Sequence, residues 1–255
     1  MTEQSLLAVW PRAALYRGVL PDLPVHAYGA ASLLAVRKGS LRVAPGEDGP
    51  AQVWLVRAGF SHRTYFGNRL AAVLFFEPDT PLAAALQHLL ASHGAMACAP
   101  SLSDELANLV FANGEDVDLD AMVQLLESRL PLVTGGLDQR VSRVCQHMRE
   151  CAGSFPSAAD MAQRVDLSEP RLQHLFKDET GVSMGVFRTV LRMRRAAGII
   201  AEGASLTDAA HGAGFSDSAH FSRRFRKMFG VKPSLVFRQV SSGAIHWLDE
   251  ATDHL

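Results

Sequence analysis

The chain has 255 residues, 48% of them hydrophobic, and a formal net charge of −1 at pH 7. This length predicts two domains with ordinary hydrophobic cores. The three cysteines lack the spacing of a disulfide framework or a zinc knuckle. The first residues lack the basic stretch of a signal peptide, and the longest apolar run, 70–76, is too short to span a bilayer. We therefore expect a soluble, cytoplasmic protein that does not enter a membrane.

The small net charge hides an uneven distribution along the chain. Residues 1–137 carry a formal charge of −4, residues 138–240 carry +6 and residues 241–255 carry −3. A basic segment joined to an acidic one is expected where the basic part binds nucleic acid. These divisions lie close to the predicted domains, which are residues 1–133, residues 138–240 and an acidic tail at 241–255.

The first 78 residues read as short strands separated by turns. Strands are predicted at 32–36, 41–43, 53–56 and 70–76. The residues between the first two of these strands, 37–40, predict a hairpin turn that pairs them directly. Many short strands in fewer than eighty residues favour a small sandwich or barrel.

Helices follow the strands. Thr80 and Pro81 predict the N-cap and first position of a helix that ends at Gly94. A second helix is predicted to begin near Ser103, and a third spans 118–130. Apolar residues at helical spacing form a stripe on this third helix, namely Leu119, Met122, Val123, Leu126 and Leu130. Gly135 and Gly136 then predict a linker.

From Asp138 onward the pattern is helical throughout. The opening helix carries an apolar face of Val141, Val144, Cys145 and Met148. A long helix is predicted at 184–201, with a buried stripe of Val186, Val190, Met193, Ala197 and Ile200. Eighteen residues make a helix of about 27 Å, which is close to the ~34 Å between successive major grooves on one face of DNA.

Residues 205–234 predict two helices joined by a tight turn. Ser205 and Asp208 form the sequence pattern of a capping box, and Gly214 supplies the positive φ that a sharp turn often needs. Asp217 or Ser218 caps the second helix. That helix presents Phe221, Phe225 and Met228 on its apolar face and several cations on the others. A short cationic helix of this kind fits a DNA major groove.

A second copy of this unit precedes the long helix. Asp160 and Asp166 match Asp208 and Gly214 at an offset of 48, and Phe176 and Gly181 match Phe225 and Gly230 at an offset of 49. Asp166 stands where the turn usually has glycine, but aspartate tolerates the left-handed region better than most residues. The sequence therefore predicts two helix-turn-helix units in tandem.

These residues resemble the DNA-binding signature of the AraC/XylS family of bacterial transcription regulators. The matching positions are Ala210, Gly214, Phe215, Asp217, the run His220 to Arg223, Phe225, Phe229, Gly230, Pro233 and Ser234. The resemblance implies a regulator that binds double-stranded DNA, acts on RNA polymerase and responds to a small-molecule effector. It also implies a homodimer formed through the helix at 118–130, although the apolar stripe of this helix is equally suited to packing on its own domain.

Alignment of the two units predicts the side chains that contact DNA. The set is Arg171, Gln173, His174, Lys177, Ser218, His220, Ser222, Arg223 and Arg226. Arg223 and Gln173 are the strongest base readers, because arginine pairs with guanine and glutamine with adenine through two hydrogen bonds. His174, His220 and Ser222 are weaker candidates, whereas Lys177 and Arg226 are predicted to hold phosphates. Arg192, Arg194 and Arg195 are predicted to pair with acids inside the domain.

The run from Trp54 to Pro78 resembles the cupin-like sensor domain of some members of that family. The predicted effector pocket contains His26, Tyr28, Trp54 and His62. The alternative is a metal-dependent cupin enzyme fused to a DNA-binding domain, in which His26, His62 and Glu77 hold the metal. Metal cupins usually present two histidines as H-x-H, but here the pattern is His26-Ala27-Tyr28. We therefore expect no metal, no cofactor and no enzymatic activity.

Overall fold

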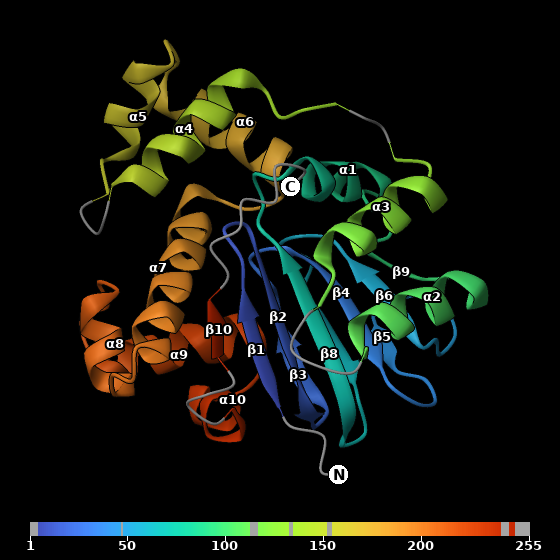
Figure 1. The fold of residues 1–255 in the computed structure, drawn as a ribbon. Coiled ribbons are helices and arrows are strands. Elements are labelled where there is room, and N and C mark those ends of the chain that lie inside the picture. The colour runs from blue at the N-terminus through green and yellow to red at the C-terminus, as the bar shows by residue number, and fades with distance from the viewer. Residues whose placement is uncertain are drawn as a thin grey trace.

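A computed structural model describes residues 5–46, 48–112, 117–132, 135–151, 155–240 and 245–247. Strands and three helices occupy the first half of the chain, and the second half consists of helices and one short strand (Figure 1). The predicted α+β architecture is therefore confirmed. None of the described helices has the length and hydropathy needed to cross a membrane.

The strands form two sheets. Their bounds are β1 (Leu6–Val9), β2 (Ala13–Leu20), β3 (Leu23–His26), β4 (Ala31–Val36), β5 (Arg42–Ala44), β6 (Val53–Val56), β7 (His62–Tyr65), β8 (Arg69–Phe76), β9 (Ala95–Ala97) and β10 (Ile245–Trp247). The larger sheet has the order β10-β1-β2-β8-β4-β6-β9, and the smaller has the order β3-β7-β5.

The hairpin predicted at 37–40 does not form. β4 pairs with β6 on one side and β8 on the other, so both of its edges are occupied within the larger sheet. β5 pairs instead with β7 in the smaller sheet. Gly39, with φ of +81°, lies in the turn that takes the chain from one sheet to the other. A turn does form at the predicted position, but it connects strands of two different sheets.

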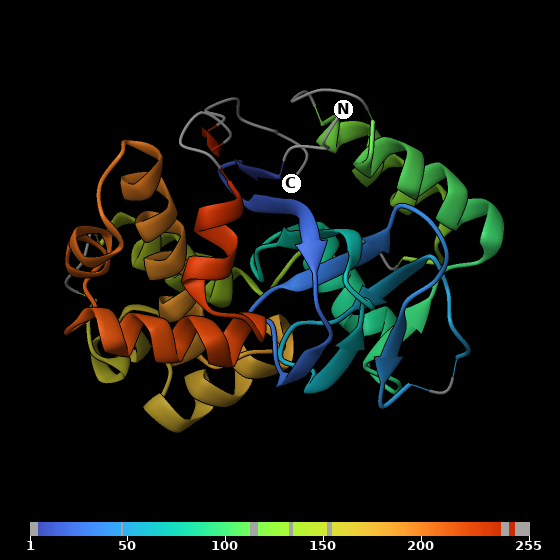
Figure 2. The ribbon, with the colours of Figure 1, turned by 90° about the horizontal axis from the view of Figure 1, so that it is seen from below.

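Each face of the larger sheet has a core of its own. Alternate residues of a strand point to opposite faces, so Leu33 and Ala35 join one core while Leu34 and Val36 join the other. The first core lies under the helices α1 (Pro81–Leu89), α2 (Pro100–Val110) and α3 (Leu119–Arg129). The second core extends into the helices of the C-terminal half, which lie beside the first strands in Figure 2.

The helices of the first half differ slightly from the predictions. Thr80 caps α1 as predicted, but α1 ends at Leu89, before Gly94. α2 begins at Pro100, and Ser103 is buried inside it, where its hydroxyl donates to the Cys98 carbonyl at 3.1 Å. The stripe predicted on α3 is buried in the core of its own domain, with Leu130 packed at the edge of that core. The structure thus favours packing over dimerisation for this stripe.

The C-terminal half contains seven described helices. These are α4 (Gln139–Glu150), α5 (Ala158–Arg164), α6 (Glu169–Thr180), α7 (Met184–Ala201), α8 (Leu206–Gly212), α9 (Ser218–Phe229) and α10 (Pro233–Gln239). The buried face predicted for α4 is confirmed, and α7 has the predicted bounds.

The two helix-turn-helix units, α5–α6 and α8–α9, share their backbone geometry. Their turns place Asp166 and Gly214 in the left-handed region, with φ of 54° and 83°. Both second helices end at a left-handed glycine, Gly181 with φ of 74° and Gly230 with φ of 75°. Left-handed backbone at both pairs of equivalent positions supports the predicted duplication.

The buried residues of α7 differ in part from its predicted stripe. Met193 is buried as predicted, but Val186, Val190, Ala197 and Ile200 are only half-buried. The other buried residues of the helix are Met184, Phe187 and Ala196. α7 lies between the two units and contacts both, with Phe187 in the core of the first and Ala196 in the core of the second. A helix packed on two sides buries more than one stripe.

The C-terminal residues return to the first domain. β10 pairs in parallel with β1, with Ile245 opposite Leu7. Three residues of the predicted acidic tail therefore extend the larger sheet at its edge. The other residues of that tail, and Val133 and Thr134 at the predicted domain boundary, lie outside the described residues, so the predicted boundaries stay predictions.

Candidate nucleic-acid interface and interdomain cavity

The first unit presents its predicted DNA-contacting residues on one exposed side of α6. Leu172 and Phe176 are fully buried and fix the rotation of the helix, which leaves the predicted set Arg171, Gln173, His174 and Lys177 exposed. The Gln173 amide donates to Glu169 Oε1 at 2.8 Å. His174 Nδ1 lies 2.8 Å from the Pro170 carbonyl oxygen, which fixes the ring against its own helix.

The second unit positions α9 in the same way. Phe221, Phe225 and Met228 are buried, and Ser218, Ser222, Arg223 and Arg226 are exposed. The N-cap is Asp217, whose carboxylate accepts the backbone N–H of His220 at 2.6 Å. Ser218 is therefore the first residue of the helix, and it faces solvent.

His220 belongs to the hydrogen-bond network at the start of α9. The Arg224 Nε–H donates to His220 Nε2 at 3.3 Å, so the proton of a neutral ring lies on Nδ1, which is 3.1 Å from Ser216 Oγ. Both ring nitrogens thus have protein partners, and the ring packs edge-on against Phe215 at 5.6 Å. This geometry favours a role for His220 in positioning the helix. The sequence analysis did not identify Arg224 as the hydrogen-bond partner of His220.

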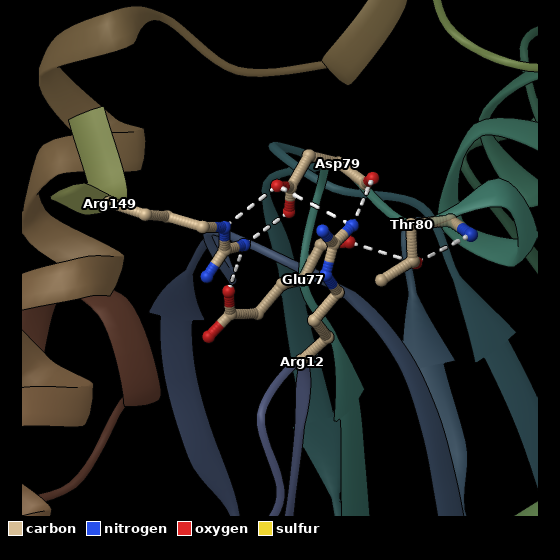
Figure 3. A network of polar contacts seen from close by, with 6 residues as sticks. Arg12, Glu77, Asp79, Thr80 and Arg149 are labelled. Atoms are coloured by element: carbon tan, nitrogen blue, oxygen red, sulfur yellow. Dashed lines mark hydrogen bonds and ion pairs between the residues drawn. The ribbon is translucent and has the colours of Figure 1, made fainter. Parts of the chain in front are cut away.

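A buried ion network joins the helical half to the first domain (Figure 3). Arg149 of α4 extends to Glu77 and Asp79, which follow β8, and its Nε donates to Asp79 Oδ2 at 2.8 Å. The side chains of Glu77 and Asp79 are only 7% and 5% exposed. Arg12 donates to the Asp79 carbonyl oxygen at 3.3 Å. Burial raises the pKa of Glu77, and the charge of Arg149 opposes that rise.

The alternative metal set does not come together. His26 and His62 are adjacent, with ring centroids 4.4 Å apart, but Glu77 belongs to the ion network with Arg149. Within the residues that the structure describes, no three histidine, cysteine or acidic side chains are grouped as metal ligands. Each histidine directs Nδ1 to a backbone carbonyl, Pro24 at 2.8 Å and Phe60 at 2.9 Å. Burial, followed by the charge of His26, lowers the pKa of His62 to about 4.

An apolar cavity of 130 Å³ lies between the larger sheet and the second unit. This volume is well above the roughly 10–15 Å³ that a single water requires. β1, β2 and β8 form one wall, and α7, α9 and α10 form the other. The polar side chains in the lining are Tyr16, Tyr28, Glu77 and Arg194.

One residue of the predicted effector pocket, Tyr28, lines this cavity. His26 and His62 are not part of the lining; their rings pack edge-on against Tyr28, at centroid distances of 4.6 Å and 5.2 Å. Trp54 is fully buried elsewhere in the second core, and its indole N–H donates to the Leu41 carbonyl at 3.3 Å. Sequence reasoning missed the residues of α7, α9 and α10 because it treated the pocket as internal to the first domain.

The C-terminal ends of α6 and α9, the second helices of the two units, pack against the first domain. A Cβ added at Gly181 would collide with the Gln87 side chain of α1, and one added at Gly59 would lie 2.5 Å from the Gly181 carbonyl oxygen. A Cβ added at Gly230 would lie 3.1 Å from Leu23 Cβ and 3.2 Å from His26 Nδ1. The first domain thus contacts α6 and α9 at equivalent positions, while the residues of these helices that are predicted to contact DNA remain exposed, apart from His220, which is half-buried.

A sheet-rich domain packed on two helix-turn-helix units is the architecture of a two-domain DNA-binding protein. Comparisons with known proteins agree with this class. A family model described as a helix-turn-helix domain matches residues 161–239. The arabinose operon regulatory protein of Escherichia coli K12 is 30% identical over 147 residues, which are 53% of this chain and 50% of that protein. The protein of the same name from Salmonella typhimurium is 32% identical over 122 residues, 46% of this chain and 43% of that protein.

The similarity to solved structures extends over both halves of the chain. The structure of ToxT from Vibrio cholerae O395 matches 90% of this chain and 98% of that chain with a TM-score of 0.60. At 13% identity this likeness shows a shared fold. The chain resembles the AraC/XylS family of transcription regulators over its helix-turn-helix region, as its signature residues predicted. It spans about half the length of the curated relatives it matches.

Proposed function

We propose that this protein is a sequence-specific, DNA-binding transcription regulator whose activity responds to a small apolar molecule held between its domains. The observation that carries the proposal is the pair of helix-turn-helix units on α7, whose second helices both present exposed side chains able to contact bases and phosphates. The family supports RNA polymerase as a partner, the cytoplasm as the location and a role other than catalysis. A homodimer stays a proposal taken from the family.

The DNA-binding function is tested by selecting bound sequences from a random duplex pool with the full chain. We expect one enriched site with two half-sites centred about 10 base pairs apart, because two recognition helices on one rigid helix reach successive major grooves. Affinity is expected to fall steeply with salt, since phosphate contacts release counterions. Failure to enrich any sequence, or a salt-independent affinity, would contradict the proposal.

The interdomain cavity supports the effector part of the proposal. Its lining is almost entirely apolar, and its two walls come from the sensor domain and the second helix-turn-helix unit. A molecule bound there contacts both parts at once, so its binding free energy depends on how they are docked. One solved structure of ToxT contains an unsaturated fatty acid. We propose an elongated apolar molecule for this chain as well.

Fatty acids of increasing length, and the corresponding alcohols, provide a test of this cavity. We expect one of these compounds to raise the melting temperature of the full chain by about 5–10 °C at 100 times its Kd. The variant Ala197→Phe fills the cavity from α7 and should abolish the shift, whereas Ala91→Phe, at an exposed position, should retain it. An equal shift in both variants, or no shift in the wild type, would refute this ligand site.

A further inference from the structure

The two recognition helices differ in charge although they are duplicates of each other. α6 carries Arg171 and Lys177 against Glu169, Asp178 and Glu179, a formal net of −1. α9 carries four cations and no acid within its bounds, a formal net of +4. A helix in the major groove lies between two rows of phosphates, which repel a carboxylate. Acidic residues on the DNA-facing side of α6 therefore call for an explanation.

Glu169 is the acidic residue nearest the predicted base readers. It is the first residue of α6, its side chain is exposed, and its Oε1 accepts the Gln173 amide at 2.8 Å. Gln173 is one turn further along the same exposed side. The equivalent residues of α9, at the offset of 49, are Ser218 and Ser222. The glutamate–glutamine pair is thus particular to the first unit.

We propose that Glu169 is a specificity-determining residue of the first unit, and that it reads a base together with Gln173. This inference rests on the proposed DNA-binding function. A carboxylate only accepts hydrogen bonds. In the major groove, cytosine N4 and adenine N6 donate, whereas the hydrogen-bonding atoms of guanine and thymine only accept. Glu169 therefore favours a base with an amino group at the position it faces and repels guanine and thymine.

The hydrogen bond between the two side chains strengthens this preference. Gln173 uses one amide hydrogen to hold Glu169, which leaves its carbonyl oxygen and its second amide hydrogen for a base. The pair is ordered before DNA arrives, so less side-chain freedom is lost on binding. The second unit, with four cations on α9, supplies more phosphate attraction than the first, where acids outnumber cations on α6. Discrimination by a well-placed pair of this kind is expected to be about 5- to 150-fold.

The test is selection of bound DNA from a random pool at one salt concentration, with the full-length wild type and three variants. Glu169→Ser gives the first unit the residue present at the equivalent position of the second. Glu169→Gln keeps the size and adds a donor. Asp178→Asn removes the same charge from another exposed position of α6 and serves as the control.

The wild type should enrich cytosine or adenine at one position of a half-site. Glu169→Ser should remove that preference, Glu169→Gln should admit guanine there, and Asp178→Asn should keep the wild-type pattern. If both Glu169 variants select the wild-type sequence and merely bind all DNA more tightly, the inference is wrong and the proposed function stands. If the wild type selects no sequence at all, the proposed function fails and the inference fails with it.

Discussion

Replacing Arg149 by methionine is expected to lower the free energy of unfolding by about 3–5 kcal/mol at pH 7. The guanidinium lies between Glu77 and Asp79, whose side chains are 7% and 5% exposed. Removing it leaves two carboxylates buried side by side without their common partner. Because Arg149 belongs to α4 and the acids follow β8, the loss falls on the contact between the two halves of the chain. Urea unfolding followed by circular dichroism measures it.

The loss of unfolding free energy in Arg149→Met should depend on pH because of Glu77. Burial raises the pKa of Glu77 in the folded protein, and removal of Arg149 takes away an interaction that lowers it. A carboxyl whose folded pKa is raised contributes stability at low pH, and this contribution is lost as pH rises through the folded pKa. The difference between Arg149→Met and the wild type should therefore be largest at neutral pH and shrink toward the ordinary carboxyl pKa of about 4.3.

The matched control is Arg129→Met. Arg129 pairs with Glu105 at 2.7 Å, but both side chains are more than 40% exposed. Solvent screens such a pair, so the expected loss is at most about 1 kcal/mol. Equal losses for Arg149→Met and Arg129→Met, or a deficit at Arg149 that does not change with pH, would show that the buried network does not hold the domains as described.

Replacing Arg223 by alanine is expected to cost about 1–3 kcal/mol of binding free energy at the selected site and to remove the base preference at one position. Arg223 is exposed on α9, more than one and a half turns after the N-cap Asp217. Arginine donates two hydrogen bonds to guanine O6 and N7, which alanine cannot replace. The measurement is the affinity of the variant for the selected site and for random DNA.

Arg226→Ala provides the control from the same helix. Arg226 is exposed near the end of α9 and is predicted to contact a phosphate. Its loss should weaken binding to all sequences alike and reduce the slope of affinity against salt by about one. If Arg223→Ala weakens random and selected DNA equally, Arg223 holds a phosphate and the base reader of the second unit lies elsewhere on α9.

The helical half of this protein could be predicted in detail from its sequence. The bounds of α7, the caps at Ser205 and Asp217, and the left-handed turns at Asp166 and Gly214 are set by residues at most a few positions apart. Capping and helical periodicity are local interactions, so a pattern in one stretch of sequence contains nearly all the information they need. The family signature resides in these local features.

Contacts between residues far apart in the sequence became visible only in the folded structure. The turn at 37–40 was correctly placed, yet pairing of β4 with β6 and β8 sent β5 into another sheet. Glu77 pairs with Arg149 and not with His26 and His62. The cavity is lined by β1 and α10, which lie at opposite ends of the chain. Local propensity does not specify strand partners or contacts between domains, because they depend on the packing of whole layers.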